Sequence, residues 1–298
     1  MRRAKAVEQW VRQVLIDLYV EEHDDVCEMY CGIGPDLGKY SRSKIDSYVG
    51  IEHAKQFLDA CEENWSKRGE PFAAEFIHLD LLKYNIKDYV SKQFDCVICQ
   101  GRLEHTFVDE LRAINFLGNV ASVLKEGGFF FGFTTDSSRV YQQVSKHQDP
   151  YTHRVRSFCR AGRQHSFQFY PRKPPNSSSI SSEEIFSRFF GTLFAIHFHP
   201  HSSSSSSEIC HTRKQYLVNF SVMQKLCGRV GLDLVLLCNF QNFLLENRSV
   251  FETSVISQNL ADLKDSEIVG ERGLSRGEWD AIGLNCVFCF QKRSLTKN

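Results

Sequence analysis

The sequence predicts an α/β fold with a doubly wound, mostly parallel sheet. Short apolar runs that suit strands alternate with segments that suit helices. The first such run, residues 25–30, leads into a turn that contains Gly32 and Gly34, and the next run, residues 47–52, ends on the acidic residue Glu52. Ligands of doubly wound sheets lie across the carboxyl ends of neighbouring strands, so this arrangement predicts a site for a nucleotide-type ligand.

An amphipathic helix is expected before the first strand. Residues 7–20 place apolar side chains at helical spacing, and these are Val7, Trp10, Val11, Val14, Leu15 and Leu18. The strands expected in this half of the chain are residues 25–30, 47–52, 73–79, 94–99 and 127–134, with helices near 53–67 and 108–125. This order is that of β-α-β units and predicts a parallel sheet.

The joint between the later helix and the last of these strands carries two glycines. Gly127 and Gly128 are expected to end the helix, because glycine adopts the positive φ of a helix C-terminus, and residues 129–133 then enter a buried strand. Further on, a helix ending near Gly228 or Gly231 precedes a strand at 232–237. Residues 283–290 are expected to form a last buried strand, so the C-terminal strands return to the sheet.

The expected organisation is one domain over residues 1–298, with an insertion at 150–215 that carries basic and serine-rich loops. Residues 150–182 hold six Lys or Arg side chains and five aromatic ones among neutral residues up to Ser182. Such a stretch suits an RNA path, because cations neutralise phosphates and aromatic rings stack on bases, and it suits a solvated basic loop equally well. The run Ser202–Ser207 is expected to be a loop tip.

Composition excludes several classes of function. The chain has 298 residues, with 36 basic and 36 acidic side chains, which argues against binding to nucleic acid through overall charge. The eleven cysteines, with no apolar leader at the start, favour reduced thiols in the cytosol or nucleus. Apolar runs stay shorter than the about 18 residues of a membrane span, so no membrane partner is expected.

Cysteine and histidine pairs raise the question of a metal site. The two Cys-x-x-Cys pairs begin at Cys96 and Cys286, but both lie in apolar strands, where side chains three apart point to opposite faces. Core packing is the favoured interpretation of these cysteines. His197, His199 and His201 alternate before the serine run, yet solvent-facing histidines are the simpler interpretation, so no metal is expected.

The acidic and amide residues at strand ends are the candidates for the ligand site. The pattern Gly-x-Gly-x-x-Gly of dinucleotide sites fails at Leu37, which favours a ligand without a pyrophosphate, such as S-adenosylmethionine. In a methyltransferase, Glu52 would hold the ribose hydroxyls, Asp80 the adenine amino edge, and Gln100 would lie at the mouth where the methyl group is transferred. The simpler alternative is that each residue only ends a strand.

Four segments resemble a known family, and they are residues 26–36, 73–80, 119–138 and 274–292. The first reads VCEMYCGIGPD and is common among methyltransferases, whereas the last two are more family-specific. Together they resemble the mRNA cap guanine-N7 methyltransferase family, in particular its divergent second plant-type branch. The resemblance runs from about residue 5 to 293 and leaves the serine run outside.

The resemblance implies a Rossmann-like, class I S-adenosylmethionine-dependent methyltransferase with a seven-stranded sheet and a cap- or RNA-binding insertion. It implies transfer of a methyl group from S-adenosylmethionine to N7 of the cap guanosine of nascent mRNA, in the nucleus. The partners implied are the capped 5′ end and the capping or transcription machinery, and the chain is expected to act as a monomer.

By position, the resemblance also assigns site residues. The cofactor residues would be Arg12, Tyr30, Gly32, Gly34, Glu52, Asp80, Gln100 and His105. The cap residues would be Lys39, Glu104, Gln215 and Asn285. Several depart from the family pattern: Arg12 replaces a lysine, Tyr30 a glycine, Gln215 a glutamate and Asn285 a tyrosine, while Glu104-His105 stands for His-Tyr.

Two rival functions remain open. A methyltransferase of the same fold could act on a small molecule or on another RNA position, because a fold does not determine the acceptor. The chain could also be a catalytically weak homologue that binds capped RNA or a partner, which the changes at Tyr30, Gln215 and Asn285 would favour. Attack by N7 needs no general base, so no catalytic base is assigned.

Overall fold

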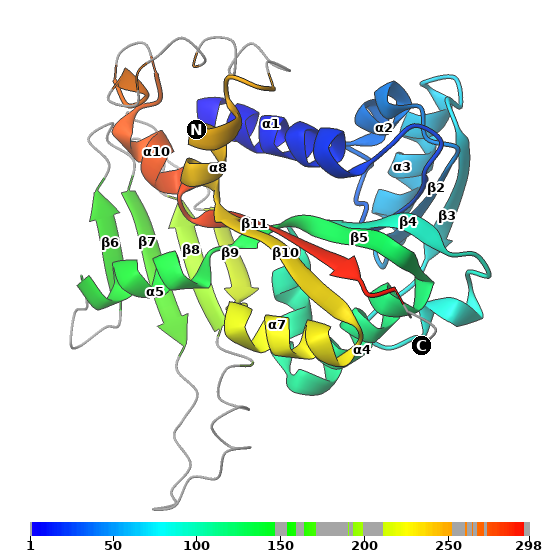
Figure 1. Ribbon diagram of the computed structural model, residues 1–298. Helices are drawn as coiled ribbons and strands as arrows, with labels where there is room; N and C mark the ends of the chain where they lie inside the picture. The colour runs from blue at the N-terminus through cyan, green and yellow to red at the C-terminus, as the bar shows by residue number, and fades with distance from the viewer. Residues whose placement is uncertain are drawn as a thin grey trace, which may run out of the picture.

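The computed structural model shows a seven-stranded sheet between two layers of helices, with a four-stranded sheet beside it (Figure 1). It describes residues 2–146, 154–158, 164–170, 190, 193–198, 211–251, 260, 264, 267–270 and 273–294. The first half of the chain builds α1 (Arg2–Tyr19), β1 (Asp25–Met29), α2 (Leu37–Ser43), β2 (Ser47–Glu52), α3 (Lys55–Ser66), β3 (Ala73–His78), η1 (Ile86–Asp88), β4 (Phe94–Gln100), η2 (Leu103–Val108), α4 (Glu110–Val123), β5 (Leu124–Thr135) and α5 (Ser137–Lys146).

The second half adds β6 (Arg154–Phe158), β7 (Gln164–Tyr170), β8 (Leu193–Phe198), β9 (His211–Tyr216), α7 (Phe220–Arg229), β10 (Leu232–Asn239), α8 (Phe240–Asn247), α10 (Arg276–Ile282) and β11 (Asn285–Lys292). The large sheet has the order β10-β11-β5-β4-β1-β2-β3. Strands β1 to β5 are parallel, and β10 and β11 join antiparallel at one side. The predicted mostly parallel, seven-stranded sheet is confirmed.

The sheet buries a separate apolar cluster on each face. One cluster joins Met29, Val97 and Phe130 to α4 and α7, and the other joins Val26, Ile98 and Phe131 to α1 and α8. Figure 1 shows the same division, with α1, α8 and α10 above the sheet and α4 and α7 below it. Burial on both faces explains why the central strands are continuous apolar runs.

Cysteines of β4 pack into this core as the sequence predicts. Cys99 belongs to the cluster beneath the sheet and Cys96 to the one above it, so the two thiols point to opposite faces. Cys286 and Cys289 of β11 are likewise buried. Among the described residues, no group of three or more histidine, cysteine or acidic side chains could hold a metal ion.

The predicted joint at Gly127 is wrong in its position. Helix α4 ends at Val123, and β5 begins directly at Leu124. The pairing of β4 with β5 steps from Phe94↔Leu124 to Cys96↔Phe129, which leaves extra residues of β5 in a bulge. Gly127 has φ +77° there, so the glycine serves a strand irregularity and not a helix end.

The inserted region contributes the smaller sheet, whose order is β6-β7-β8-β9 with every pair antiparallel. Strand β8 carries His197, the first of the three alternating histidines, while His199 and His201 lie outside the described residues. Residues 171–189 and the serine run lie outside the described residues. Strand β9 packs beside η2, which brings the insertion to the carboxyl ends of the large sheet.

No helix among the described residues combines the length and apolar character that a bilayer crossing demands.

Candidate functional site

The turn after β1 contains three residues with positive φ. Tyr30 has φ +61°, Gly32 +57° and Gly34 +70°. A Cβ on Gly34 would lie 2.5 Å from Leu37 Cδ1, so both backbone and space require glycine there. Tyr30 adopts the same left-handed backbone conformation although it carries a Cβ, so its backbone is strained.

Glu52 holds this turn against the end of β2. Its carboxylate accepts hydrogen bonds from the backbone N–H groups of Gly32 (3.1 Å), His53 (2.9 Å) and Ala54 (3.1 Å). Ala54 is the N-cap of α3, so the negative charge also lies at the positive end of a helix. The predicted residues of β1 and β2 therefore do lie together, at the carboxyl edge of the sheet.

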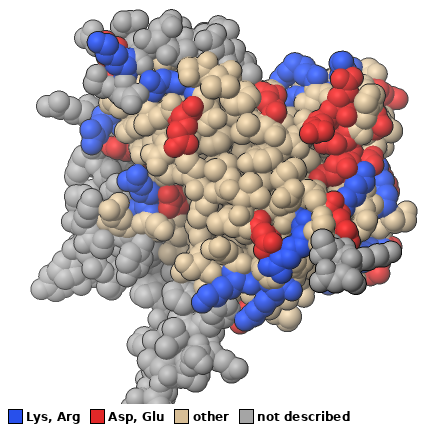
Figure 2. All heavy atoms as spheres, viewed as in Figure 1, with Lys and Arg blue, Asp and Glu red and all other residues tan. Residues whose placement is uncertain are grey.

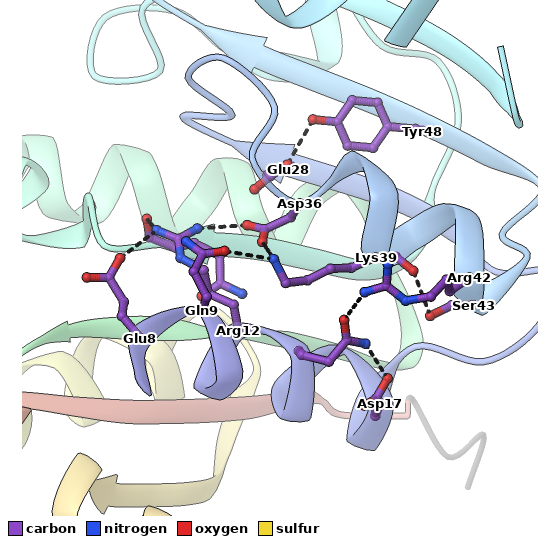
Figure 3. A network of polar contacts seen from close by, with 12 residues as sticks. Glu8, Gln9, Arg12, Asp17, Glu28, Asp36, Lys39, Arg42, Ser43 and Tyr48 are labelled. Atoms are coloured by element: carbon purple, nitrogen blue, oxygen red, sulfur yellow. Dashed lines mark hydrogen bonds and ion pairs between the residues drawn. The ribbon is translucent and has the colours of Figure 1, made fainter. Parts of the chain in front are cut away.

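Asp36 joins two buried cations from separate helices (Figure 3). It is fully buried and accepts hydrogen bonds from Arg12 of α1 at 2.7 Å and from Lys39 of α2 at 2.6 Å. Glu8 lies 3.3 Å from Arg12, and Gln9 accepts from Lys39 at 3.0 Å. Burial disfavours the guanidinium, but the charges of Asp36 and Glu8 outweigh it and raise the pKa of Arg12.

A buried acid of β1 lies next to this network (Figure 3). Glu28 is 2% exposed and accepts a hydrogen bond from the Tyr48 hydroxyl at 2.9 Å. Burial, followed by the nearby charge of Asp36, raises the pKa of Glu28 well above its usual value. The burial of Glu28 beside Asp36 therefore favours the neutral form of its carboxyl group.

Gln100 ends β4 with an amide that has no hydrogen-bond partner among the described residues, although both its polar atoms are buried. Arg12 reaches the same strand end, since its Nη2 lies 3.5 Å from the Gln100 carbonyl oxygen. The Nε of Arg12 is also buried and unpartnered within the described part of the chain. Because buried polar groups are nearly always paired, these atoms indicate a polar ligand at this edge of the sheet.

Asp80 follows β3 and is half-buried. It accepts hydrogen bonds from the backbone N–H of Leu82 at 3.1 Å and from Lys83 at 2.8 Å. Burial raises its pKa, but the Lys83 and Leu82 hydrogen bonds together lower it below the usual value. The lowered pKa favours the ionised carboxylate of Asp80, which can accept further hydrogen bonds at the end of β3.

A second polar cluster joins η2, β5 and β9. Glu104 is 1% exposed and accepts hydrogen bonds from the Gln215 amide at 2.7 Å and the Thr134 hydroxyl at 3.1 Å. The Thr135 hydroxyl in turn donates to the Gln215 side-chain oxygen at 3.0 Å. Asn285, the first residue of β11, pairs in register with Thr135, so three of the four predicted acceptor residues, Glu104, Gln215 and Asn285, lie in one neighbourhood.

Lys39 and His105 complete the predicted set. Lys39 lies in the Asp36 network and not in the Glu104 cluster. His105 is half-buried in η2, next to Glu104 in the chain. The structure therefore brings the predicted residues to one edge of the large sheet.

Three residues that support this edge, Asp36, Thr134 and Thr135, were not among those predicted from the sequence. Asp36 directly follows the Gly-x-Gly-Pro turn, so its place beside a predicted ligand loop was a signal. Thr134 and Thr135 end a buried strand, the same position that identified Glu52 and Gln100.

Solved structures with this fold define the class of protein. An S-adenosylmethionine-dependent methyltransferase from Clostridium acetobutylicum superposes with a TM-score of 0.55 at 10% identity, over 97% of this chain and 92% of that one. The CcbJ methyltransferase of Streptomyces caelestis gives the same TM-score at 10% identity, over 97% and 94%. The fold is that of Rossmann-like, class I S-adenosylmethionine-dependent methyltransferases.

Sequence comparison then gives the family. The model of the mRNA (guanine-N(7))-methyltransferase domain matches residues 2–156 and 207–293, so the chain belongs to that family. The predicted resemblance is confirmed, and S-adenosylmethionine is the methyl donor of such an enzyme.

Among its relatives is mRNA cap guanine-N(7) methyltransferase 2 of Arabidopsis thaliana, 27% identical over 287 residues that cover 95% of this chain and 75% of the relative. The mRNA cap guanine-N(7) methyltransferase of Schizosaccharomyces pombe is 23% identical over 304 residues, covering 98% and 76%.

Proposed function

We propose that the chain methylates N7 of the 5′ cap guanosine of mRNA, using one pocket at the carboxyl edge of the sheet for donor and acceptor. The observation that carries the site assignment is Gln100, whose buried amide has no hydrogen-bond partner among the described residues and lies at a strand end, where doubly wound sheets bind their ligands.

The residues at this edge fit S-adenosylmethionine, which supplies an activated methyl group when bound. Glu52 and Asp80 place carboxylate oxygens at neighbouring strand ends, where Glu52 suits ribose hydroxyls and Asp80 the adenine amino group. The unpartnered Nε of Arg12 suits the carboxylate of the methionine moiety, and the Gln100 amide suits its polar groups. Tyr30, Gly32, Gly34 and His105 border the same turn and strand ends.

The chain's chemical task is alignment. Guanine N7 has an in-plane lone pair and no proton, so the site needs no general base. Holding the nucleophile against the methyl group lowers the barrier by roughly 7–11 kcal/mol through proximity alone. Buried carboxylates near the acceptor also favour the positive charge that develops on the guanine ring.

We propose that Glu104 supplies this charge in the acceptor pocket. The family glutamate that reads guanine is Gln215 here, and Gln215 donates a hydrogen bond to Glu104 at 2.7 Å. The carboxylate of Glu104 therefore lies next to the position of the family glutamate, which Gln215 occupies in this chain. Thr134 and Thr135 fix this pair in place, and Asn285 lies beside it in the strand register.

Lys39 is the proposed contact for the cap phosphates, and the basic insertion is the proposed path for the RNA. On the face drawn in Figure 2, basic and acidic side chains are mixed around a broad uncharged area. The balance of 36 basic and 36 acidic side chains supports recognition through a local site in preference to overall charge. Nuclear action on nascent mRNA, as a monomer alongside the capping machinery, belongs to the same proposal.

The acceptor is tested by methyl transfer from labelled donor to capped RNA, with uncapped RNA and free small molecules as rival acceptors. We expect label in capped RNA, and about tenfold weaker donor binding in Asp80→Ala, since a lost hydrogen bond to a charged group costs roughly 1.5–3 kcal/mol. Preferred labelling of a small molecule would reject the cap assignment and leave the fold class intact.

Glu104→Gln tests the charge assignment. We expect lower transfer to capped RNA with unchanged binding of S-adenosylhomocysteine, because Glu104 lies in the acceptor cluster. Glu110→Gln is the matched control, since Glu110 is a partly exposed residue whose ion pair with Arg229 is 3.7 Å long. Equal transfer by Glu104→Gln and the parent chain would refute the role of Glu104.

A catalytically weak homologue that mainly binds RNA is a second candidate function. It is favoured by Tyr30, which replaces a glycine in the turn after β1 (residues 30–34, the donor turn). Calorimetry with S-adenosylhomocysteine separates the two: capped-RNA binding without donor binding would identify the second function.

A further inference from the structure

Tyr30 is the one residue of the donor turn whose conformation needs an explanation. It directly follows β1 and has φ +61° despite its Cβ. Strained residues persist only where their surroundings hold them, so the contacts of this side chain carry the argument.

Two aromatic rings hold Tyr30. Its ring is stacked on Phe116 of α4, with 5.8 Å between centres and 9° between planes. It also meets the His53 ring edge-on at 6.1 Å and 82°. His53 follows Glu52 directly, so the Tyr30 ring lies between α4 and the end of β2.

The Tyr30 hydroxyl is buried and has no hydrogen-bond partner among the described residues. Burial, followed by the charges of the neighbouring Cys99, Asp80 and Glu52 side chains, raises the pKa of the phenol. The Tyr30 ring meets the His53 ring, and His53 Nδ1 lies 2.8 Å from the Glu52 carboxylate, so the phenol lies beside the end of β2, where the proposed function places the ribose. Contacts between rings favour this position, while backbone strain and an unpaired hydroxyl oppose it.

We propose that the Tyr30 side chain fills the nucleoside part of the donor pocket in the free chain and must rotate away before S-adenosylmethionine binds. Tyr30 is then an affinity-determining residue of the reaction, because each binding event requires the loss of its contacts with Phe116 and His53. This inference rests on the proposed donor site. In that site, a purine ring held beside Glu52 and Asp80 would compete with the phenol for the space next to His53.

The test is calorimetric binding to Tyr30→Gly, Tyr30→Phe and the parent chain. The ligands are S-adenosylhomocysteine and 5′-methylthioadenosine, which is the nucleoside half of the donor. Glycine removes the ring and relieves the positive φ, so Tyr30→Gly should bind both ligands at least tenfold more tightly than the parent. Tyr30→Phe keeps the ring and should stay within about threefold of the parent, and Tyr84→Gly, at an exposed tyrosine, is the control.

Equal or weaker binding by Tyr30→Gly would overturn the proposal, since a ring that competes with the nucleoside cannot be removed without a gain. Tenfold weaker binding by Tyr30→Phe would also overturn it and would assign the hydroxyl as a donor contact. If the parent binds and only the gain is missing, the donor site stands and the role of Tyr30 alone fails. If neither chain binds, the donor site fails with it.

A second measurement does not depend on the folding of Tyr30→Gly. In protein labelled with 3-fluorotyrosine, one fluorine resonance should shift on addition of S-adenosylhomocysteine, and that resonance should be missing from Tyr30→Phe. A Tyr30 resonance that keeps its position through saturation would overturn the proposal.

Discussion

Asp36→Asn should destabilise the fold strongly, because Asp36 holds two cations that are themselves buried. Its carboxylate is fully buried, and the side chains of Arg12 and Lys39 are each 10% exposed. Asparagine keeps the shape of the side chain and removes its charge. The substitution therefore leaves both cations without their shared carboxylate.

The size of the effect follows from these contacts. Loss of one partner from a buried ion pair costs about 3–5 kcal/mol. Glu8 remains 3.3 Å from Arg12 and Gln9 remains 3.0 Å from Lys39, so both cations keep a partner. We therefore expect the lower end, about 3 kcal/mol, which lowers the urea midpoint by roughly 1 M at an m-value of about 3 kcal/mol/M.

Urea unfolding of Asp36→Asn beside Glu8→Gln measures this effect. Glu8 touches the same arginine, but its side chain is 38% exposed, so its loss should cost below about 1 kcal/mol. Asp36→Asn should also weaken binding of S-adenosylhomocysteine, because Arg12 loses the contact that orients it. If Asp36→Asn costs no more than Glu8→Gln, the two cations are not held by Asp36 and the account of the network is refuted.

Three further predictions concern neighbouring residues. The raised pKa of Glu28 means that the folded chain holds a proton which the unfolded chain releases, so the unfolding free energy falls as pH rises above about 4.5, by up to about 1.4 kcal/mol per pH unit. Glu28→Gln should remove this slope in urea titrations between pH 5 and 8, and parallel curves for parent and variant would contradict it. Gln100→Leu should leave the unfolding free energy within about 1 kcal/mol or raise it, since the amide has no partner in the described part of the chain, and calorimetry should show at least tenfold weaker S-adenosylhomocysteine binding; unchanged binding would remove Gln100 from the donor site. Asn119→Ala should cost about 2–4 kcal/mol in thermal or urea unfolding, because its amide bonds Leu81, Tyr84 and Ile86 after β3, and a loss below 1 kcal/mol would contradict this role.

The site residues at the strand ends could be predicted from the sequence, because the order of strands and helices predicts a parallel sheet. Glu52, Asp80 and Gln100 end successive apolar runs, and carboxyl ends of parallel strands share one edge. Helix α2 was missed, since its seven residues LGKYSRS include a glycine and two serines and give no clear apolar stripe.

The rest of the site depends on long-range contacts that spacing does not reveal. Glu104 and Gln215 are 111 residues apart in the chain and meet only because β9 packs beside η2. Strands β6 and β7 carry polar and basic residues in a range where composition indicated loops, and they form through pairing with β8 and β9. The bulge at Gly127 likewise follows from the register of β4 and β5, not from local propensity.

Identification of the methylated nucleoside tests the central claim most directly. Capped RNA is incubated with the chain and labelled S-adenosylmethionine, digested to nucleosides and separated. Label in 7-methylguanosine, absent when the same transcript bears a 5′ triphosphate, is the predicted result. Label confined to another nucleoside, with 7-methylguanosine unlabelled, would contradict the assignment of the cap guanine as the acceptor.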